Sequence, residues 1–114
     1  MLLTIEQKRR DPGIVVLEMK GRICLGRDCQ EVEWVVNDLL KKEEKKIIFD
    51  MGGISLVDST GIGILVTCFG RLRKVGGELR LAAVQEKVRE VLTITCVDRI
   101  IPLYSTVDEA AANF

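Results

Sequence analysis

The sequence predicts an α/β fold: one domain over residues 1–114, with a mixed, mostly parallel sheet of four or five strands and about four helices. Short apolar runs alternate with segments whose apolar residues recur at helical spacing, which gives the order ββαβαβαβα. Hydrophobic residues make up 47% of the chain, enough for one modest core at this length. The sequence contains no internal repeat, linker or low-complexity segment, so a single domain is expected.

The amino-terminal part is predicted to form a β-hairpin followed by a helix. The hairpin covers residues 2–20, turns at "DPG" (residues 11–13) and ends at Gly21. After an irregular passage the helix opens at Asp28, and Glu31 stands three positions later, the spacing of a capping box. The buried face of this helix comprises Val32, Val35, Val36, Leu39 and Leu40. The mixed charges of "KKEEKK" then indicate a solvated connection.

The rest of the chain alternates strands with helices. Residues 46–51 form a buried strand bounded by two glycines, "ISLVD" is a loop, and a helix starts near residue 58 and ends before Gly76 or Gly77. The buried face of that helix comprises Ile62, Leu65, Val66, Phe69 and Leu72. The later elements are the strand "ELRLAAV", the helix "QEKVREVLTIT", the strand "RIIPLY" closed by Pro102, and a terminal helix capped by Ser105 or Thr106. Such alternation predicts parallel pairing through right-handed crossovers.

The composition excludes several classes of function. Lys and Arg together number 17, as do Asp and Glu, so the net charge is zero and disfavours a role on nucleic acid or on a membrane surface. Histidine is absent, which excludes imidazole acid–base catalysis and histidine-ligated metal sites. The longest nearly apolar run, "GIGILVTCFG", is too short to span a bilayer, so no membrane insertion is expected. The first residues lack the pattern of a secretory signal, and a cytoplasmic location is expected.

Four cysteines are present, and their spacing indicates no metal site. Cys24, Cys29, Cys68 and Cys96 contain no C-x-x-C pair. In the cytoplasm these thiols are expected to be reduced, and each is interpreted as a small apolar filler of the core.

Two helical side chains face away from the predicted core. Trp34 lies opposite the valine–leucine face of the first helix. It either packs beneath the loop around Cys24 or contacts a partner or a second copy of the chain, because exposed aromatic residues are enriched at interfaces. On the next helix, Ile64 shares an exposed stripe with Thr67 and Arg71 and is a further candidate for a partner contact.

The segment "LVDSTGIG", residues 56–63, has two interpretations. Asp58 and Ser59 are good helix caps, and Gly61 and Gly63 permit close backbone approach, which is enough for a purely structural role. The segment also lies between a central strand and a helix, where open α/β sheets place their sites and where free amides favour an anion such as a phosphate on Ser59. It matches neither G-x-S-x-G nor a complete nucleotide-binding motif, so a catalytic serine or a nucleotide site is disfavoured.

From Lys46 onward the sequence resembles the STAS domain (sulfate transporter and anti-sigma factor antagonist), the family of the anti-sigma factor antagonists. The matching features are a strand followed by "DSTGIG", a helix ending in "GGELRL", then "VREVLTIT" and a terminal "EAA". The resemblance extends over almost the whole chain, and its most specific part is "DSTGIG" in this context.

The resemblance implies a phosphorylation-switched interaction module rather than an enzyme. In the family, the unphosphorylated antagonist binds an anti-sigma factor that is also a serine kinase of the histidine-kinase-like ATPase type, and a phosphatase restores that form. Ser59 would be the phosphoacceptor, Asp58 would position the loop and assist phosphotransfer, and Thr60 and Gly61 would support the site. No cofactor, catalytic residue or metal ligand is expected in this chain, since ATP and magnesium would belong to the kinase.

The sequence departs from the family after the second predicted strand. Family members often carry Gly-Glu-[Leu/Ile]-Asp there, whereas this chain has "GRIC", with Arg22 and Cys24 in place of the two acids. The charge of the expected partner surface therefore differs. The expected partner contacts are Arg22, Cys24, Trp34, Ile64, Thr67 and Arg71.

Three further expectations remain open from the sequence. The chain could instead be a STAS adaptor subunit of a transporter or another signalling complex, in which Ser59 is never phosphorylated. It could also be a sensor of a nucleotide or another small ligand. In any of these roles it could form a homodimer.

Overall fold

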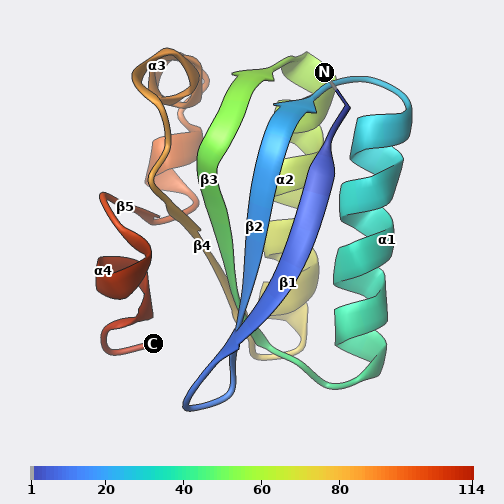
Figure 1. Ribbon diagram of the computed structural model, residues 1–114, viewed down its shortest axis with the longest axis vertical. Coiled ribbons are helices and arrows are strands. Elements are labelled where there is room, and N and C mark those ends of the chain that lie inside the picture. The colour runs from blue at the N-terminus through green and yellow to red at the C-terminus, as the bar shows by residue number, and fades with distance from the viewer. Residues whose placement is uncertain (1) are drawn as a thin grey trace.

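Five strands form one sheet whose order in space is the order along the chain, β1-β2-β3-β4-β5 (Figure 1). The computed structural model describes residues 2–114, and in it the strands are β1 Thr4–Arg10, β2 Ile14–Ile23, β3 Lys46–Val57, β4 Glu78–Ala82 and β5 Leu103–Tyr104. β1 and β2 form an antiparallel hairpin, whereas β2–β3, β3–β4 and β4–β5 pair in parallel. The predicted α/β fold and its order of elements are confirmed.

The helices cover both faces of the sheet. Their bounds are α1 Arg27–Lys41, α2 Ser59–Lys74, α3 Glu86–Ile94 and α4 Val107–Ala111, with a single 3-10 turn η1, Val97–Arg99, after α3. α1 and α2 pack against each other on one face, α3 packs beside β3, and α4 covers part of the opposite face (Figure 1). Among residues 2–114, every helix is too short or too polar to traverse a lipid bilayer.

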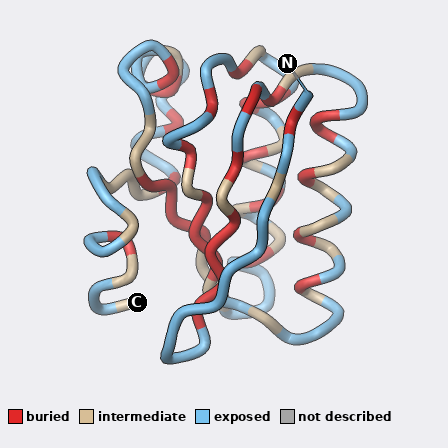
Figure 2. Tube along the Cα trace, viewed as in Figure 1, coloured by how far each residue is buried: buried red, intermediate tan, exposed pale blue. Residues whose placement is uncertain are grey.

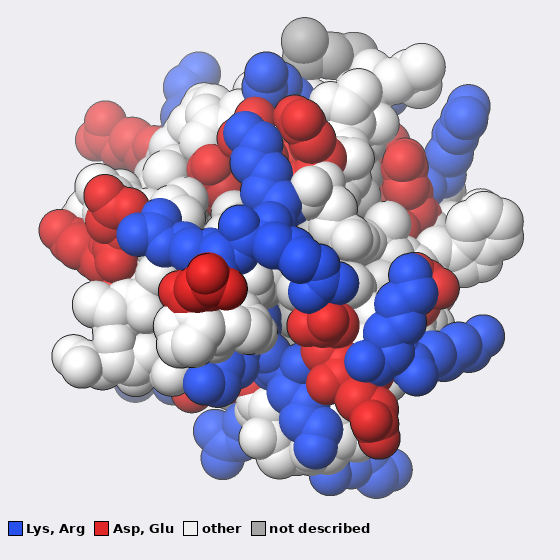
Figure 3. Space-filling view, turned by 60° about the horizontal axis from the view of Figure 1, so that its bottom comes forward, with Lys and Arg blue, Asp and Glu red and all other residues white. Residues whose placement is uncertain are grey.

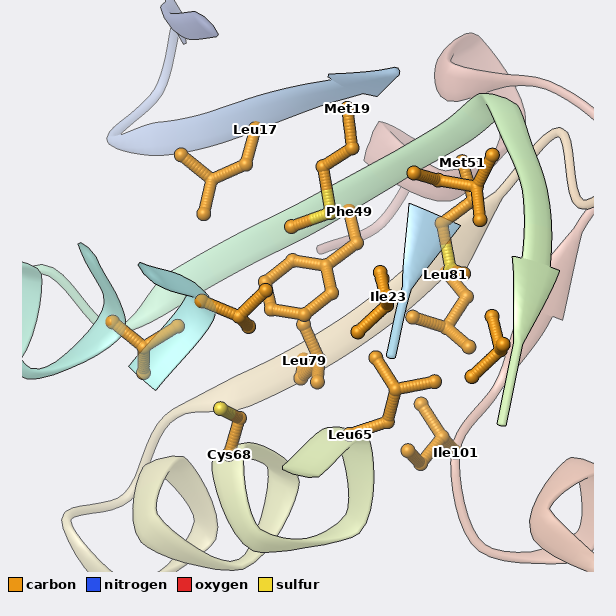
Figure 4. Close-up of a cluster of buried hydrophobic side chains, with 14 of the residues drawn as sticks. Leu17, Met19, Ile23, Phe49, Met51, Leu65, Cys68, Leu79, Leu81 and Ile101 are labelled. Atoms are coloured by element: carbon orange, nitrogen blue, oxygen red, sulfur yellow. The ribbon is translucent and has the colours of Figure 1, made fainter. Parts of the chain in front are cut away.

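The main core lies between the sheet and the helices α1 and α2. Leu17 and Met19 of β2 point into it, while Ile14 and Val16, at the alternate positions, point to the face that α4 covers. The ring of Phe49 lies among Leu17, Met19 and the helical side chains (Figure 4). Buried residues follow the central strands and the inner sides of α1 and α2 (Figure 2). Each such side chain contributes about 1.5–3 kcal/mol on burial.

A buried arginine fixes the carboxyl-terminal segment to the sheet. The Arg80 side chain on β4 donates to the backbone oxygens of Ala110 and Ala112 at 2.8 and 3.2 Å, and to Glu78 at 2.7 Å. Its guanidinium also lies 4.1 Å from the centre of the Phe114 ring, a cation–π distance. Arg80 therefore holds α4 and the chain end against the second face.

The start of α1 differs from the prediction. β2 continues through Gly21 to Ile23, and α1 begins at Arg27 with Gly26 as its N-cap, so Asp28 lies inside the first turn. The Asp28 carboxylate accepts a hydrogen bond from the backbone N–H of Cys24 at 3.2 Å, and Gly26, the actual cap residue, has no side chain with which to cap. The predicted capping box is therefore wrong, because Asp28 stabilises the preceding loop instead.

The predicted loop "ISLVD" is also wrong for four of its five residues. β3 runs through Gly52 and Gly53 to Val57, and only Asp58 lies outside the strand. A Cβ on Gly53 would lie 2.8 Å from the backbone oxygen of Met19, so glycine permits the close approach of β2 and β3 at a shift in their register. The two glycines mark an irregularity within one strand rather than its end.

The carboxyl-terminal elements follow the predicted order, but four of the six residues of the predicted strand "RIIPLY" lie outside β5, since Arg99 ends η1 and residues 100–102 precede the strand. Pro102 precedes the two-residue β5 instead of closing it. Thr106 is the N-cap of α4, and its hydroxyl accepts from the Glu109 N–H at 3.1 Å, which confirms one of the two predicted caps.

Candidate functional site

The candidate site is the junction between the end of β3 and the start of α2. Asp58 is the N-cap residue of α2, and its Oδ1 accepts a hydrogen bond from the backbone N–H of Gly61 at 2.8 Å. This bond satisfies one of the first-turn donors that have no partner within the helix. The prediction of Asp58 as a helix cap is confirmed.

The same carboxylate also binds the loop between β2 and α1. Asp58 Oδ2 accepts from the backbone N–H of Leu25 at 2.9 Å, and the Asp58 N–H donates to the Ile23 oxygen at 3.3 Å. The hydrogen bonds from Leu25 and Gly61 lower the pKa of Asp58 below its ordinary value of 3.8. At neutral pH the site therefore holds a fixed negative charge that joins two loops.

Gly61 is required by the packing at this junction. A Cβ at position 61 would lie 2.1 Å from the backbone oxygen of Ile23 and 2.8 Å from the side chain of Val57. The first turn of α2 therefore packs directly on the ends of β2 and β3. At Gly63, by contrast, nothing lies within 4 Å of an added Cβ.

Ser59 and Thr60 are both exposed in the first turn of α2. Ser59 directly follows the cap residue Asp58, so it lies in the first turn of α2, at the positive end of the helix dipole. A partner can reach the Ser59 hydroxyl without any rearrangement of the core. Asp58, Ser59, Thr60 and Gly61 thus form the start of α2, and the role of Ser59 as a phosphoacceptor stays a prediction.

Two exposed leucines flank this junction, and the sequence analysis missed them. Leu25, whose N–H binds Asp58, is 75% exposed, and Leu56, two residues before Asp58, is 50% exposed. Large apolar side chains around an exposed polar group are typical of protein interaction surfaces. No local pattern could reveal them, since Leu25 lay in an irregular segment and Leu56 in a predicted loop.

The residues of "GRIC" lie at the same edge of the sheet. Arg22 is exposed at the end of β2, where it is the register partner of Leu56 on β3. Its Nε lies 3.8 Å from the Asp28 carboxylate, a loose ion pair. Cys24 is half-buried in the next loop, and its N–H is bound by Asp28. Arg22 and Cys24 are therefore close to the junction that carries Ser59.

The three candidates further along α2 differ in their exposure, since Thr67 is exposed whereas Ile64 and Arg71 are half-buried. Ile64 is half-buried against the main core, and the Thr67 hydroxyl donates to the Gly63 oxygen at 2.9 Å. Arg71 donates to Glu33 at 2.7 Å and to Asn37 at 3.0 Å, so it joins α2 to α1. At 1.5 Å per residue it lies about 18 Å along the helix from Ser59. The predicted exposed stripe is confirmed at Thr67 but not at Ile64, which packs against the core, or at Arg71, whose side chain bridges two helices.

Trp34 projects into solvent. Its side chain is 80% exposed in the middle of α1, which excludes the first of the two predicted roles, packing beneath the loop around Cys24. It separates two open grooves of about 770 and 620 Å³ along the outer side of α1. The alternative of a contact residue therefore remains.

The cysteines differ from one another in their surroundings. All four are free thiols; Cys29 and Cys68 are buried, Cys24 is half-buried and Cys96 is exposed. Burial raises the pKa of Cys68 to about 12, and burial followed by the charge of Asp58 raises that of Cys29. The interpretation of Cys96 as core filler is wrong, since it lies on the surface after α3. Within the described part of the chain, no group of three His, Cys, Asp or Glu is placed to hold a metal ion.

Charges are mixed on the end of the molecule away from Ser59. On the face shown in Figure 3, Lys and Arg side chains lie next to Asp and Glu, without one dominant sign.

The junction that carries Ser59 offers an accessible hydroxyl, the fixed carboxylate of Asp58 and a rim of exposed apolar side chains, Leu25 and Leu56. These groups suit binding to a protein and modification by one.

The chain belongs to the STAS family, since the STAS domain matches residues 7–110. A Thermotoga neapolitana protein, named as a proposed anti-sigma factor antagonist, is 35% identical over 78 residues, which cover 68% of this chain and 69% of that protein. The anti-sigma-B factor antagonist of Listeria monocytogenes is 27% identical over 113 residues, covering 99% of this chain and 98% of that one.

Solved structures show the same fold. The crystal structure of a proposed anti-sigma factor antagonist from Thermotoga maritima superposes with a TM-score of 0.86 at 28% identity, covering 93% of this chain and 90% of that chain. The Bacillus cell fate determinant SpoIIAA, solved in its phosphorylated form, has a TM-score of 0.73 at 18% identity, with coverage of 94% and 96%. At that identity SpoIIAA supports the fold alone.

Proposed function

We propose that the protein is a cytoplasmic anti-sigma factor antagonist whose binding to its partner is switched by phosphorylation of Ser59. The partner is an anti-sigma factor that is also a serine kinase of the histidine-kinase-like ATPase type, and a phosphatase reverses the modification. The chain itself acts by binding and not by catalysis. The names of its relatives support the general role of an anti-sigma factor antagonist.

One observation carries the proposal: Ser59 is an exposed hydroxyl beside a carboxylate that the fold holds in place. Asp58 is fixed by backbone donors on two sides, from Leu25 and from Gly61. An ordinary helix cap needs only the second of these bonds. The exposed Leu25 and Leu56 next to the serine give a partner apolar surface to cover.

The negative charge of a phosphate on Ser59 would switch off binding of the partner. A phosphate on Ser59 adds a charge of about −1.5 to −2 beside the ionised Asp58. The amino end of α2 favours that charge, so the fold is retained. A partner that covers the site must remove water from the phosphate and the carboxylate together, which costs several kcal/mol without new cationic contacts and weakens binding by about a hundredfold or more.

The test is calorimetry of three proteins, wild type, Ser59→Ala and Ser59→Asp, against the histidine-kinase-like ATPase of the same host. We expect Ser59→Ala to bind as tightly as unmodified wild type and Ser59→Asp to bind at least tenfold more weakly, with unchanged circular dichroism. Ser105 is a matched control, because it is another exposed serine just before a helix. Ser105→Ala and Ser105→Asp should leave binding unaltered.

A kinase assay with ATP and magnesium completes the experiment. We expect one phosphate per chain in wild type and in Ser105→Ala, and none in Ser59→Ala. Equal affinity of all three proteins, together with no incorporation of phosphate into wild type, would contradict the switch and leave Ser59 as part of a helix start in an adaptor.

A further inference from the structure

Within residues 2–114, β1 leaves one long edge of the sheet unpaired. Its seven residues, Thr4–Arg10, pair with β2 on one side only, and all except Ile5 are exposed (Figure 2). Backbone N–H and C=O groups on the free side form a ready template for another strand. The opposite edge strand, β5, has only two residues.

The positive charges on β1 are compensated within the chain. Lys8 pairs with Glu18 at 2.8 Å, Arg9 with Glu44 at 2.8 Å and Arg10 with Asp108 at 2.7 Å. Charged edges usually prevent strands from pairing, because like charges repel. Here that repulsion is reduced.

Glu6 stands apart from these pairs. Within residues 2–114 no ion pair includes Glu6, and its register partner on β2 is another acid, Glu18. Directly opposed like charges destabilise a sheet. The cross-strand neighbour of Glu6 on β2 is thus an acid and not a cation.

We propose that two copies of the chain associate through antiparallel pairing of their β1 strands, with a two-fold axis at Gln7. An axis perpendicular to the sheet keeps each residue on its own face, so Thr4 opposes Arg10, Ile5 opposes Arg9 and Glu6 opposes Lys8 of the second copy. All seven residues of each strand are paired in this register.

The charges select this register over its neighbours. An axis at Glu6 would oppose two glutamates, and an axis at Lys8 would oppose two lysines. With the axis at Gln7, each Glu6 gains a lysine from the second copy, twice per dimer. That lysine also remains in reach of its own Glu18, so it lies between two carboxylates, one from each copy.

Trp34 lies beside the same edge. The larger of its two grooves, about 770 Å³, is lined by Gln7 of β1 together with Trp34, Val35, Asn37, Asp38 and Lys41 of α1. Because the axis is perpendicular to the sheet, the α1 helices of both copies lie on the same face of the joined sheet, and its position at Gln7 places this groove next to the interface. The dimer thus gives an otherwise solvated tryptophan a surface to cover it, and tryptophan is among the residues that contribute most binding energy near the centres of interfaces.

The test uses sedimentation equilibrium of wild type, Glu6→Lys, Lys8→Glu and the double variant Glu6→Lys/Lys8→Glu. We expect wild type to dimerise reversibly and each single substitution to weaken the dimer at least tenfold, since like charges then oppose each other. The double variant exchanges the two charges and should restore dimerisation. Circular dichroism and unfolding curves of the four proteins check that each is folded.

Fluorescence gives an independent readout, because Trp34 is the one tryptophan of the chain. Its emission should move to shorter wavelength as the wild-type concentration rises, and should not move in Glu6→Lys. A wild type that stays monomeric at about millimolar concentration, or a dimer that all three charge variants leave unchanged, would overturn the proposal. A double variant that folds but stays monomeric would overturn the register.

Discussion

The carboxylate of Asp58 accepts a hydrogen bond at 2.9 Å from the backbone N–H of Leu25, a residue 33 positions earlier in the chain. The bond crosses from the start of α2 to the loop that follows β2, so one side chain fixes both segments that surround Ser59. An exposed serine on an otherwise mobile loop would lose more conformational entropy when it is bound by a partner. Here that ordering is already provided by the fold.

Replacement of Asp58 tests how much this connection contributes. Asp58→Ala removes both acceptors and leaves the Leu25 and Gly61 N–H groups without them, so we expect a loss of about 1–2 kcal/mol in the free energy of unfolding. Asp58→Asn keeps one acceptor and should lose less. Urea denaturation at neutral pH measures both. An alanine variant as stable as wild type would show that water replaces the carboxylate without loss.

The contribution of Asp58 should also depend on pH. Its native pKa lies below the ordinary value of 3.8, so its stabilisation is present above about pH 4 and is lost as the pH falls through the native pKa. The difference in stability between wild type and Asp58→Asn should therefore shrink between neutral pH and about pH 2.5. A difference that is constant over this range would exclude the ionised carboxylate as its source.

Gly61 and Gly63 form a matched pair on α2. Gly61→Ala forces a Cβ toward the Ile23 oxygen at 2.1 Å and should destabilise the protein by about 1–3 kcal/mol or more. Gly63→Ala meets nothing within 4 Å and should stabilise it by about 0.5–1 kcal/mol, because alanine favours the helix. Unfolding of both variants in urea separates the two effects. Equal changes would show that the first turn of α2 adjusts freely.

Much of the fold followed from the sequence because the hydrophobic periods were unambiguous. Val32, Val36 and Leu39 are fully buried on α1, as their spacing predicted. The errors occurred where a local pattern competed with contacts from distant residues. Asp28 has the spacing of a helix cap, but its carboxylate accepts a hydrogen bond from the Cys24 N–H. Gly53 resembles the end of a strand, but it lies within β3, where the absence of a side chain lets β2 approach closely.

The candidate site was predicted only in part, because some of its residues are adjacent in the sequence and others are not. Asp58, Ser59 and Gly61 are contiguous, so the sequence could group them. Leu25 belongs to the site only because β2 and β3 are parallel neighbours whose ends coincide. Arg71, assigned to a partner surface from its helical position, instead bonds to Glu33 on a neighbouring helix, which no single-helix pattern reveals.

Arg71 should therefore matter for stability rather than for partner binding. We expect Arg71→Ala to lower the free energy of unfolding by about 1 kcal/mol, because it separates α2 from Glu33 and Asn37. A double-mutant cycle with Glu33→Ala should give a coupling of about 0.5–1 kcal/mol that decreases at high salt. Zero coupling would mean that the pair contributes nothing to the packing of the helices.

Cys68 should limit stability at high pH. Its native pKa is about 12, above the ordinary 9.0, so the unfolded chain loses this proton first as the pH rises. The free energy of unfolding should therefore fall by up to about 1.4 kcal/mol per pH unit above pH 9, in addition to the effect of other groups. The Cys68→Ala variant starts from lower stability because it leaves a cavity. Its free energy of unfolding should not show the part of the fall with pH that comes from the Cys68 thiol. Cys96→Ala, which removes an exposed thiol, is the control. Urea denaturation of the three proteins between about pH 8 and 10.5 measures how the free energy of unfolding of each changes with pH. Parallel curves for wild type and Cys68→Ala would show that the buried thiol does not govern the alkaline loss.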